Sequence, residues 1–174
     1  ISYVSIAKDM DVVLKDIDFK ALSLGQKNIW KIIKRKKDLR DFSAKKILAN
    51  LQTTTNWKNF SDCSLIVEAV FEDIELKKKI FSEIENTVTK DTVIASNTSA
   101  IPIKQLAQGM KHPERFLGMH YFSPVQRMPL LEIIKTPQTS KSALETAVNL
   151  GIKQGKTVIV VEDGPGFYTT RILG

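Results

Sequence analysis

Two ionisable residues in apolar, strand-like surroundings are the strongest candidates for chemistry in this sequence. His120 lies in Gly-Met-His-Tyr-Phe-Ser-Pro (118–124), and Glu132 follows twelve positions later in Leu-Leu-Glu-Ile-Ile (130–134). An ionisable side chain in an apolar strand is costly unless it has a partner. A buried imidazole held by a carboxylate is a common way to build a general base that works near neutral pH. We therefore interpret His120 and Glu132 as a candidate catalytic pair.

A second candidate region is the polar cluster Ala-Ser-Asn-Thr-Ser-Ala at 95–100, which closes another apolar strand. Its hydroxyl and amide groups include Ser99. The carboxyl ends of strands are where open α/β sheets place their ligands. This position therefore favours a role for the cluster beside the His120 region.

The elements that would position these residues alternate along the chain. We expect near-continuous apolar strands followed by amphipathic helices, which is typical of an α/β fold with a doubly wound, Rossmann-like and mainly parallel sheet. Expected strands cover 10–15, 51–55, 63–70, 92–95, 115–122, 130–135 and 156–161. Expected helices cover 19–37, 74–87 and 103–110, with a helix from Ser43 through 50 and one capped by Ser140 or Ser142 that reaches 152. For Ser142, Glu145 would complete a capping box.

Length and composition limit the classes of protein. With 174 residues and 43% hydrophobic content, the chain can bury one sizeable core, or one core and the start of a second domain. The single Cys63 excludes an internal disulfide and offers no metal-ligand spacing, so we expect a reducing compartment and no metal. No apolar run approaches the roughly 20 residues of a transmembrane helix. Because the chain begins with Ile1, we expect any targeting segment to lie outside it.

The net charge of +7 is concentrated in a basic run at 31–46. The run has two interpretations, the solvated face of a helix or a landing site for phosphates. Nucleic-acid binding is the weaker form of the second, because no stacking aromatic residues or nucleic-acid motif accompany the lysines. We therefore expect no nucleic-acid partner.

A doubly wound nucleotide-binding domain normally opens with a strand and a glycine-rich turn whose amides hold a pyrophosphate. The sequence contains no G-x-G-x-x-G, but Asp16 lies where the second strand of such a domain would end. An acidic residue there characteristically binds the ribose hydroxyls of NAD. Residues 1–8 would then be the back half of the first helix, and we expect the first strand and its glycine turn to lie before residue 1.

Six ordered segments together resemble the NAD-binding domain of the L-3-hydroxyacyl-CoA dehydrogenases. They are VVLKD at 12–16, VEAVFED at 67–73, ASNTS at 95–99, GMHYFSPV at 118–125, LLEII at 130–134 and DGPGFYTTR at 163–171. The resemblance covers essentially the whole chain. It implies an NAD-binding domain at 1–163, with 164–174 as the hinge and start of a helical C-terminal domain.

This resemblance implies NAD-dependent oxidation of 3-hydroxyacyl-CoA to 3-ketoacyl-CoA in fatty-acid β-oxidation. His120 would remove the proton from the 3-hydroxyl, and Glu132 would orient the imidazole and stabilise its charged form. Ser99 would hydrogen-bond the substrate oxygen and lie near the cofactor.

The resemblance also implies a set of binding residues. Those expected at the cofactor NAD are Asp16, Val70, Phe71, Glu72, Lys77, Ser99 and Ser123. Lys77 has an equal alternative, since it could be one more solvated helix lysine beside Lys78 and Lys79. Weaker substrate contacts fall on Lys36, near the phosphates of coenzyme A, and on Thr170, where single-function members of the family have an asparagine.

The segments at 120–125 and 164–171 are closest in wording to the trifunctional-enzyme alpha-subunit branch of the family. That branch carries an enoyl-CoA hydratase domain and implies a mitochondrial location, a homo- or hetero-oligomer and peripheral association with a membrane. The main alternative is a non-catalytic module that binds CoA or a nucleotide through the basic helix. An NAD-linked dehydrogenase of another β-hydroxyacid ranks lower, because many of those use a lysine in place of the His120–Glu132 pair.

Overall fold

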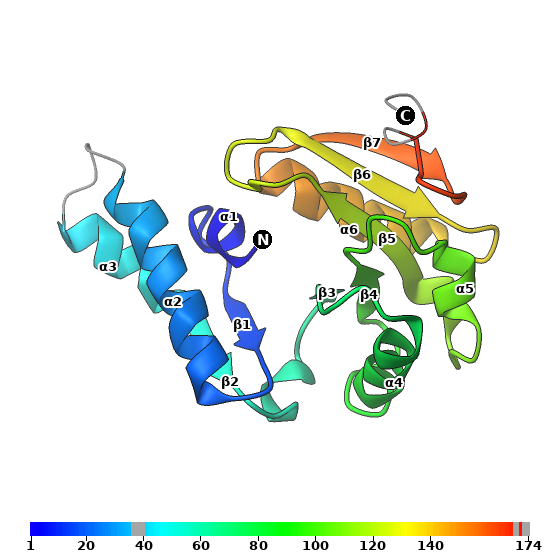
Figure 1. The fold of residues 1–174 in the computed structure, drawn as a ribbon, viewed down its shortest axis with the longest axis horizontal. Coiled ribbons are helices and arrows are strands. Elements are labelled where there is room, and N and C mark those ends of the chain that lie inside the picture. Colours follow the sequence, from blue (N-terminus) through cyan, green and yellow to red (C-terminus); the bar gives the residue numbers. More distant parts are fainter. Residues whose placement is uncertain (36–40, 169–170, 172–174) are drawn as a thin grey trace. The chain divides into compact units, whose positions relative to one another are not determined.

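The structure is a computed structural model that describes residues 1–35, 41–168 and 171. The chain divides into two compact units, an N-terminal unit of residues 1–60 and a C-terminal unit of residues 61–174. Each unit contains its own sheet, of two strands in the first and five in the second (Figure 1).

The N-terminal unit packs helices against a parallel strand pair, with Val12 opposite Leu51 in the register. Helix α2 buries Leu22, Ile29 and Ile33 because their spacing places them on one face. Asp18 caps this helix by accepting a hydrogen bond from the amide of Ala21 at 2.7 Å. The elements are α1 (Ser2–Ile6), β1 (Val12–Lys15), α2 (Phe19–Lys34), α3 (Asp41–Ala49), β2 (Leu51–Thr54) and the 3-10 helix η1 (Lys58–Phe60).

The C-terminal unit is a five-stranded sheet in the order β3-β4-β5-β6-β7. The pairings are parallel except for β5 with β6, which is antiparallel. This confirms the expected mainly parallel α/β class. The elements are β3 (Leu65–Glu68), α4 (Ile74–Glu85), β4 (Val93–Ser96), α5 (Ile103–Ala107), the 3-10 helix η2 (Pro113–Arg115), β5 (Phe116–Tyr121), β6 (Leu130–Lys135), α6 (Lys141–Lys153) and β7 (Thr157–Glu162).

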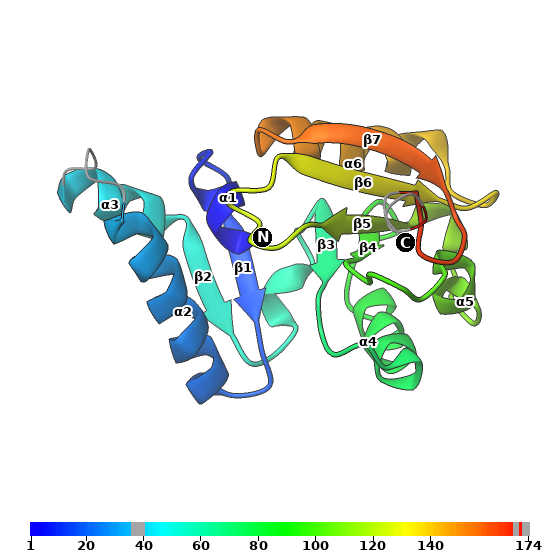
Figure 2. The same ribbon diagram turned by 45° about the horizontal axis from the view of Figure 1, so that its top comes forward.

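The core of this unit lies around β4 and β5, whose residues are all buried. Strands covered on both faces show this continuous burial. Helix α6 covers one face of the sheet (Figure 2), and its Gly151 lies so close to Leu131 and Val158 that an added Cβ would approach their side chains within 2.7–2.8 Å. Gly118 allows equally close packing on β5, where the side chain of Ile103 from α5 takes the space that a Cβ would need.

Several expected boundaries were wrong by one to three residues. The strand expected at 63–70 ends at Glu68, because Val70 turns its amide back to the Glu68 carboxylate. Helix α2 ends at Lys34 with Arg35 as its C-cap, and residues 36 and 37 lie outside the described part of the chain. Strand β1 begins at Val12 rather than 10, and the helix expected at 74–87 ends at Glu85.

One expected helix cap was also wrong, and one of the two alternatives for another cap is confirmed. Helix α3 begins at Asp41, so Ser43 lies inside the helix and does not cap it. Ser140 caps α6 by accepting a hydrogen bond from the amide of Ala143 at 3.2 Å. Ser142 therefore lies in the first turn, where its carbonyl accepts a hydrogen bond from the Thr146 hydroxyl, and no capping box with Glu145 forms.

Candidate functional site

The antiparallel register of β5 and β6 places His120 directly opposite Glu132. Side chains of directly opposed residues project from the same face of a sheet, so the imidazole and the carboxylate meet without any help from a loop. Nδ1 of His120 lies 2.7 Å from Oε2 of Glu132, and their exposed fractions are 8% and 0%. The expected partnership of these two residues is confirmed.

This pairing determines the chemistry that the ring can perform. A buried carboxylate accepts a hydrogen bond, so we assign the ring proton to Nδ1 and the lone pair of the neutral imidazole to Nε2. A ring held this way can take a proton at Nε2, while the adjacent negative charge stabilises the imidazolium that forms. The pair has the geometry of a general base.

Aromatic rings enclose the imidazole. The centroids of Phe122 and Phe167 lie 4.5 and 5.7 Å from that of His120. Phe167 is fully buried and has a positive φ of 51°, in a turn closed by its amide hydrogen bond to the carbonyl of Gly164 at 3.1 Å. Just before this turn, the Asp163 carboxylate accepts hydrogen bonds from the first two amides of α5, those of Ile103 and Lys104, at 2.9 and 2.8 Å.

Ser99 lies in the turn after β4, and it is exposed. The side chain of Asn97 ties this segment to the histidine strand, because its Oδ1 accepts a hydrogen bond from the amide of Tyr121 at 2.9 Å. Strands β4 and β5 are parallel neighbours with Ser96 opposite Gly118. The structure thus brings the end of the Ser99 strand beside the strand that carries His120.

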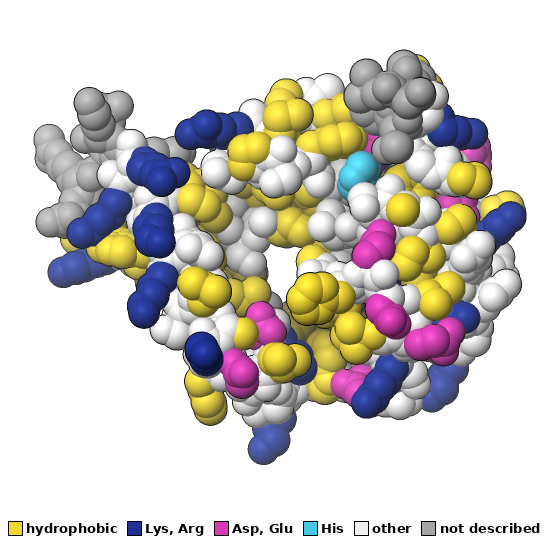
Figure 3. Space-filling view, viewed as in Figure 1, with side chains coloured by type: hydrophobic (Ala, Val, Ile, Leu, Met, Phe, Trp, Pro, Cys, Tyr) yellow, Lys and Arg dark blue, Asp and Glu magenta, His cyan; other side chains and the backbone are white. Residues whose placement is uncertain are grey.

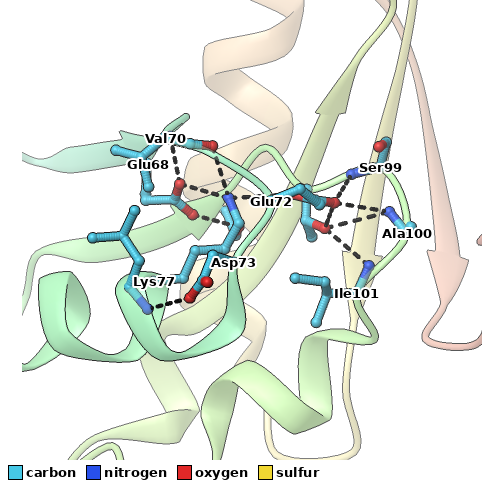
Figure 4. A network of polar contacts seen from close by, with 11 residues as sticks. Glu68, Val70, Glu72, Asp73, Lys77, Ser99, Ala100 and Ile101 are labelled. Carbon is cyan, nitrogen blue, oxygen red and sulfur yellow. Dashed lines mark hydrogen bonds and ion pairs between the residues drawn. The ribbon is translucent and has the colours of Figure 1, made fainter.

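The carboxyl end of β3 carries a network of buried charges that the sequence analysis did not anticipate (Figure 4). Lys77 is fully buried, and its ammonium lies 2.7 Å from Oε1 of Glu68 and 3.3 Å from Oε2 of Glu72. The alternative of a solvated helix lysine is therefore wrong. Glu68 is also buried and accepts a hydrogen bond from the Ser96 hydroxyl at 2.7 Å.

Glu72 joins this network to the Ser99 turn. One of its carboxylate oxygens accepts hydrogen bonds from the amides of Ser99 and Ala100, at 3.0 and 3.2 Å, and from the hydroxyl of Thr98. Burial raises the pKa of Glu72, but these hydrogen bonds and the charge of Lys77 lower it by more, so that its pKa lies below the ordinary 4.5. Glu72 is therefore held as a carboxylate.

Other expected cofactor residues lie on exposed turns of the same unit. Val70 and Phe71 follow β3 with exposed fractions of 40% and 86%. Ser123 is exposed at the start of the β5–β6 loop. The ammonium of Lys156, whose pKa burial lowers, anchors this loop by donating to the carbonyls of Val125 and Met128.

In the N-terminal unit, Asp16 directly follows β1 and is exposed. One of its carboxylate oxygens accepts a hydrogen bond from the amide of Ile17 at 2.8 Å, which fixes the orientation of the side chain. Lys36 and Thr170 lie outside the described residues. Within residues 1–35, 41–168 and 171, no group of side chains is arranged to hold a metal ion, and no helix is long and apolar enough to cross a membrane.

Sequence reasoning missed Glu68, Phe122, Phe167, Asp163 and Lys156. Glu68 had a usable signal, since an acidic residue that closes an apolar strand needs a partner. Asp163 and Lys156 had no such signal, because their partners are backbone groups of distant segments. Asp163 accepts from backbone amides, and Lys156 donates to backbone carbonyls.

Comparison with known proteins identifies relatives. The family described as "3-hydroxyacyl-CoA dehydrogenase, NAD binding domain" matches residues 1–164. FadB2 of M. tuberculosis is 33% identical over 99% of this chain and 62% of its own, with a TM-score of 0.93. The (S)-3-hydroxybutyryl-CoA dehydrogenase PaaH1 of Ralstonia eutropha is 32% identical over the same shares, with a TM-score of 0.95.

A third relative is the dehydrogenase part of multifunctional enzyme 1 from C. elegans, 29% identical over 92% of this chain and 37% of its own, with a TM-score of 0.82. The chain spans less than two thirds of the length of these relatives. Because the family match extends over residues 1–164, this chain belongs to the NAD-binding domain family of the 3-hydroxyacyl-CoA dehydrogenases.

Proposed function

We propose that the protein catalyses the reversible, NAD-dependent oxidation of 3-hydroxyacyl-CoA to 3-ketoacyl-CoA, a step of fatty-acid β-oxidation. The observation that carries this proposal is the buried His120–Glu132 pair, with 2.7 Å between Nδ1 and the carboxylate. A relative from Ralstonia eutropha is named as a (S)-3-hydroxybutyryl-CoA dehydrogenase, which supports the substrate class.

Each side chain of the proposed site has a separate role in the reaction. In the oxidation direction, Nε2 of His120 takes the proton of the 3-hydroxyl as the C3–H bond breaks, and it returns this proton in the reduction direction. Glu132 keeps the ring oriented and stabilises the imidazolium. The Ser99 hydroxyl hydrogen-bonds the substrate oxygen, and Phe122 and Phe167 exclude water from the faces of the imidazole.

The exposed residues fit NAD in kind. Asp16 offers a carboxylate at the end of a parallel strand, which suits ribose hydroxyls, while Val70 and Phe71 offer apolar surface to a flat ring. We propose Asp16 as an NAD contact of the N-terminal unit, and Val70, Phe71, Ser99 and Ser123 as NAD contacts of the C-terminal unit, where Glu72 lines the nicotinamide side. When bound, NAD accepts the hydride from C3 of the substrate.

We further propose that the protein is of the trifunctional-enzyme alpha-subunit type. The wording of the segments at 120–125 and 164–171 supports this assignment. The same resemblance supports a mitochondrial location, a homo- or hetero-oligomer and peripheral association with a membrane.

One observation favours the alternative of a non-catalytic module that binds CoA or a nucleotide. Residues 1–60 contain 13 lysines and arginines against 6 acidic residues, a net charge of +7 that equals that of the whole chain. In the view of Figure 3, blue side chains gather over this unit. Lys20, Lys27, Lys31 and Lys34 are exposed along one side of α2, which contains no acidic residue to neutralise them.

The decisive experiment measures NADH oxidation driven by acetoacetyl-CoA, in the full-length protein that contains this chain. The chain has two histidines, so His112→Ala is a matched control for His120→Ala. His112 is exposed, lies before strand β5 and pairs with Glu114 at 3.1 Å.

We expect the His120→Ala substitution to lower kcat by about 10²–10⁴-fold, as loss of a general base does. The His112→Ala substitution should leave kcat within about twofold, since surface changes away from a site have small effects. A folded parent protein that binds NADH without turnover would overturn the proposed function and favour the binding module.

A further inference from the structure

Lys77 has a buried environment that its neighbours on α4 do not share. Three consecutive lysines occupy positions 77–79, yet Lys77 is fully buried while Lys79 is exposed. A buried ammonium is costly unless charges and hydrogen bonds compensate it. The environment of Lys77 must therefore be built for that charge.

The ammonium of Lys77 donates two hydrogen bonds and forms an ion pair with a further carboxylate oxygen. The acceptors are Oε1 of Glu68 at 2.7 Å and the carbonyl of Val70 at 3.2 Å, and the ion-pair partner is Oε2 of Glu72 at 3.3 Å. A lysine ammonium has three donors and no acceptor, and the contacts of this one are with oxygen atoms of the protein. Lys77 therefore acts on other protein groups.

Glu68 is equally well satisfied. Its Oε1 accepts from the amide of Val70 at 2.6 Å as well as from Lys77, and its Oε2 accepts from the Ser96 hydroxyl. The pair thus connects the end of β3, helix α4 and the end of β4. Figure 4 shows these contacts converging on the two side chains.

Glu72 connects Lys77 to the Ser99 turn, because it contacts both. One of its oxygens faces Lys77, and the other accepts from the amides of Ser99 and Ala100. The Glu72 side chain itself is 39% exposed, so without Lys77 it would have water as a competing partner on one side. The lysine fixes the direction in which this carboxylate is presented.

A contribution to stability alone does not explain this arrangement. Replacing a buried ion pair by apolar residues of similar volume is often neutral or stabilising, so stability would not require the pair. An apolar pair in place of Glu68 and Lys77 would have no charge to attract the Glu72 carboxylate, so it could not orient that group. The charges are therefore suited to fixing geometry.

We propose that Glu68 and Lys77 are positioning residues: their buried ion pair orients Glu72, and Glu72 in turn fixes the turn that presents Ser99. This inference rests on the proposed function for the role of Ser99. It gives Lys77 a role in the support of the site that the sequence analysis did not assign to it.

The first test measures amide hydrogen exchange at Ser99 and Ala100 in the full-length protein, without substrate. It compares the parent with three variants, Lys77→Met, Glu72→Gln and the exposed control Lys79→Met. We expect exchange at both amides to accelerate about tenfold or more in the first two variants, because a hydrogen bond to a charged acceptor is lost or weakened. The control should match the parent.

Because Lys77→Met leaves the Glu68 charge buried and unpaired, a second variant protects the test against unfolding. Glu68→Gln/Lys77→Met removes both charges and keeps an amide oxygen that can accept from the Val70 amide, while the NH2 group can donate to the Ser96 hydroxyl oxygen. If the pair only stabilises the fold, this variant should recover parental exchange and turnover. Our proposal expects a stable protein whose Ser99 amide still exchanges fast.

Turnover supplies a further readout through a double-mutant cycle between Lys77→Met and Glu72→Gln. If two residues act through one another, replacing both lowers kcat little more than replacing one. The kcat of the double variant should therefore lie within about threefold of that of the less active single variant. Multiplicative losses would mean an independent cofactor contact and would overturn the proposal. Since exchange needs no substrate, an inactive parent would refute the proposed function while the positioning test still gave its answer.

Discussion

Two buried glutamates of the same sheet hold their partners by different means. Glu132 lies inside β6, and its partner His120 stands opposite it in the next strand. Glu68 ends β3, and its partners come from helix α4, from strand β4 and from the turn at Val70. A ladder of backbone hydrogen bonds fixes the first pair, whereas the second depends on several elements meeting at one point.

This difference has consequences for chemistry and for tolerance of change. Strand register fixes which residues stand opposite each other, so the His120–Glu132 distance should be insensitive to small movements of helices. The Glu68–Lys77–Glu72 network should respond to any shift of α4. The His120–Glu132 pair is thus held by the stiffer of the two arrangements.

The largest expected effect is loss of the charge beside His120. Glu132→Gln keeps the volume but removes the negative charge, and its amide can impose the wrong proton arrangement on Nδ1. We expect kcat for acetoacetyl-CoA reduction to fall by roughly 10²–10⁴-fold, as when the carboxylate behind a catalytic histidine becomes an amide. Steady-state kinetics and circular dichroism together check this.

The network provides the comparison for that result. Glu68→Gln, which also neutralises a buried glutamate, should lower kcat less than Glu132→Gln does, because Glu68 acts on the site through two further residues. Equal losses in the two variants would contradict the distinction between a group that touches the base and a group that supports the turn.

The strand-borne pair could be predicted from sequence, and the network could not. His120 and Glu132 each lie in an apolar run, so both their burial and their need for a partner follow from local pattern. The sequence around Lys77 does not indicate burial, because a run of three lysines is typical of a solvated helix face. Its burial depends on how α4 packs, which is a property of the tertiary structure.

The same reasoning explains the fold. The strand and helix types were predicted because hydrophobic periodicity is local, whereas their ends depended on individual hydrogen bonds. The strand at 65–68 stops where the Val70 amide turns toward Glu68, and α6 begins at the residue whose hydroxyl reaches the Ala143 amide. These contacts distinguish Ser140 from Ser142, which the sequence pattern left open.

A substitution in the histidine strand can test its stiffness. Gly118→Ala would place a Cβ 2.8 Å from Cδ1 of Ile103 and 2.9 Å from Cδ1 of Ile134, both of which are fully buried. Such overpacking should lower the free energy of unfolding by about 1–3 kcal/mol in urea denaturation. If register dominates, kcat stays within about threefold of the parent.

Gly25→Ala is the matched control, because its Cβ would meet Leu14 at an ordinary 3.4 Å inside helix α2. Alanine in a helix interior should be neutral or stabilising by about 0.5–1 kcal/mol. If the Gly118→Ala protein is folded under the assay conditions but has a much lower kcat, the strand ladder is less rigid than its register implies.

A smaller effect is expected from the cap of α4. Asp73 accepts a hydrogen bond from the amide of Leu76 at 2.8 Å, next to the turn that carries Lys77. Asp73→Ala should lower the free energy of unfolding by about 1 kcal/mol and accelerate exchange at the Ser99 amide. Ser140→Ala, which removes the equivalent cap of α6, should affect stability similarly without that change at Ser99.

The smallest expected effect is a pH dependence confined to the network. Because the pKa of Glu72 in the folded protein lies below its ordinary 4.5, its carboxylate stabilises the folded state fully above pH 4.5. This stabilisation is lost as the pH falls from 4.5 through the lower folded value. Glu72→Gln has no such group, so its difference from the parent in urea denaturation should be constant above pH 5 and shrink below 4.5.

Glu75→Gln is the control for this last prediction, since Glu75 is exposed on the same helix and lies 3.7 Å from the Lys78 ammonium at the surface. A surface pair contributes little, so this variant should follow the parent closely at every pH. If the Glu72→Gln difference instead persisted unchanged to pH 3, Glu72 would not be held as a carboxylate by the Ser99 turn. The contact between Glu72 and the Ser99 turn would then not depend on the charge of the carboxylate.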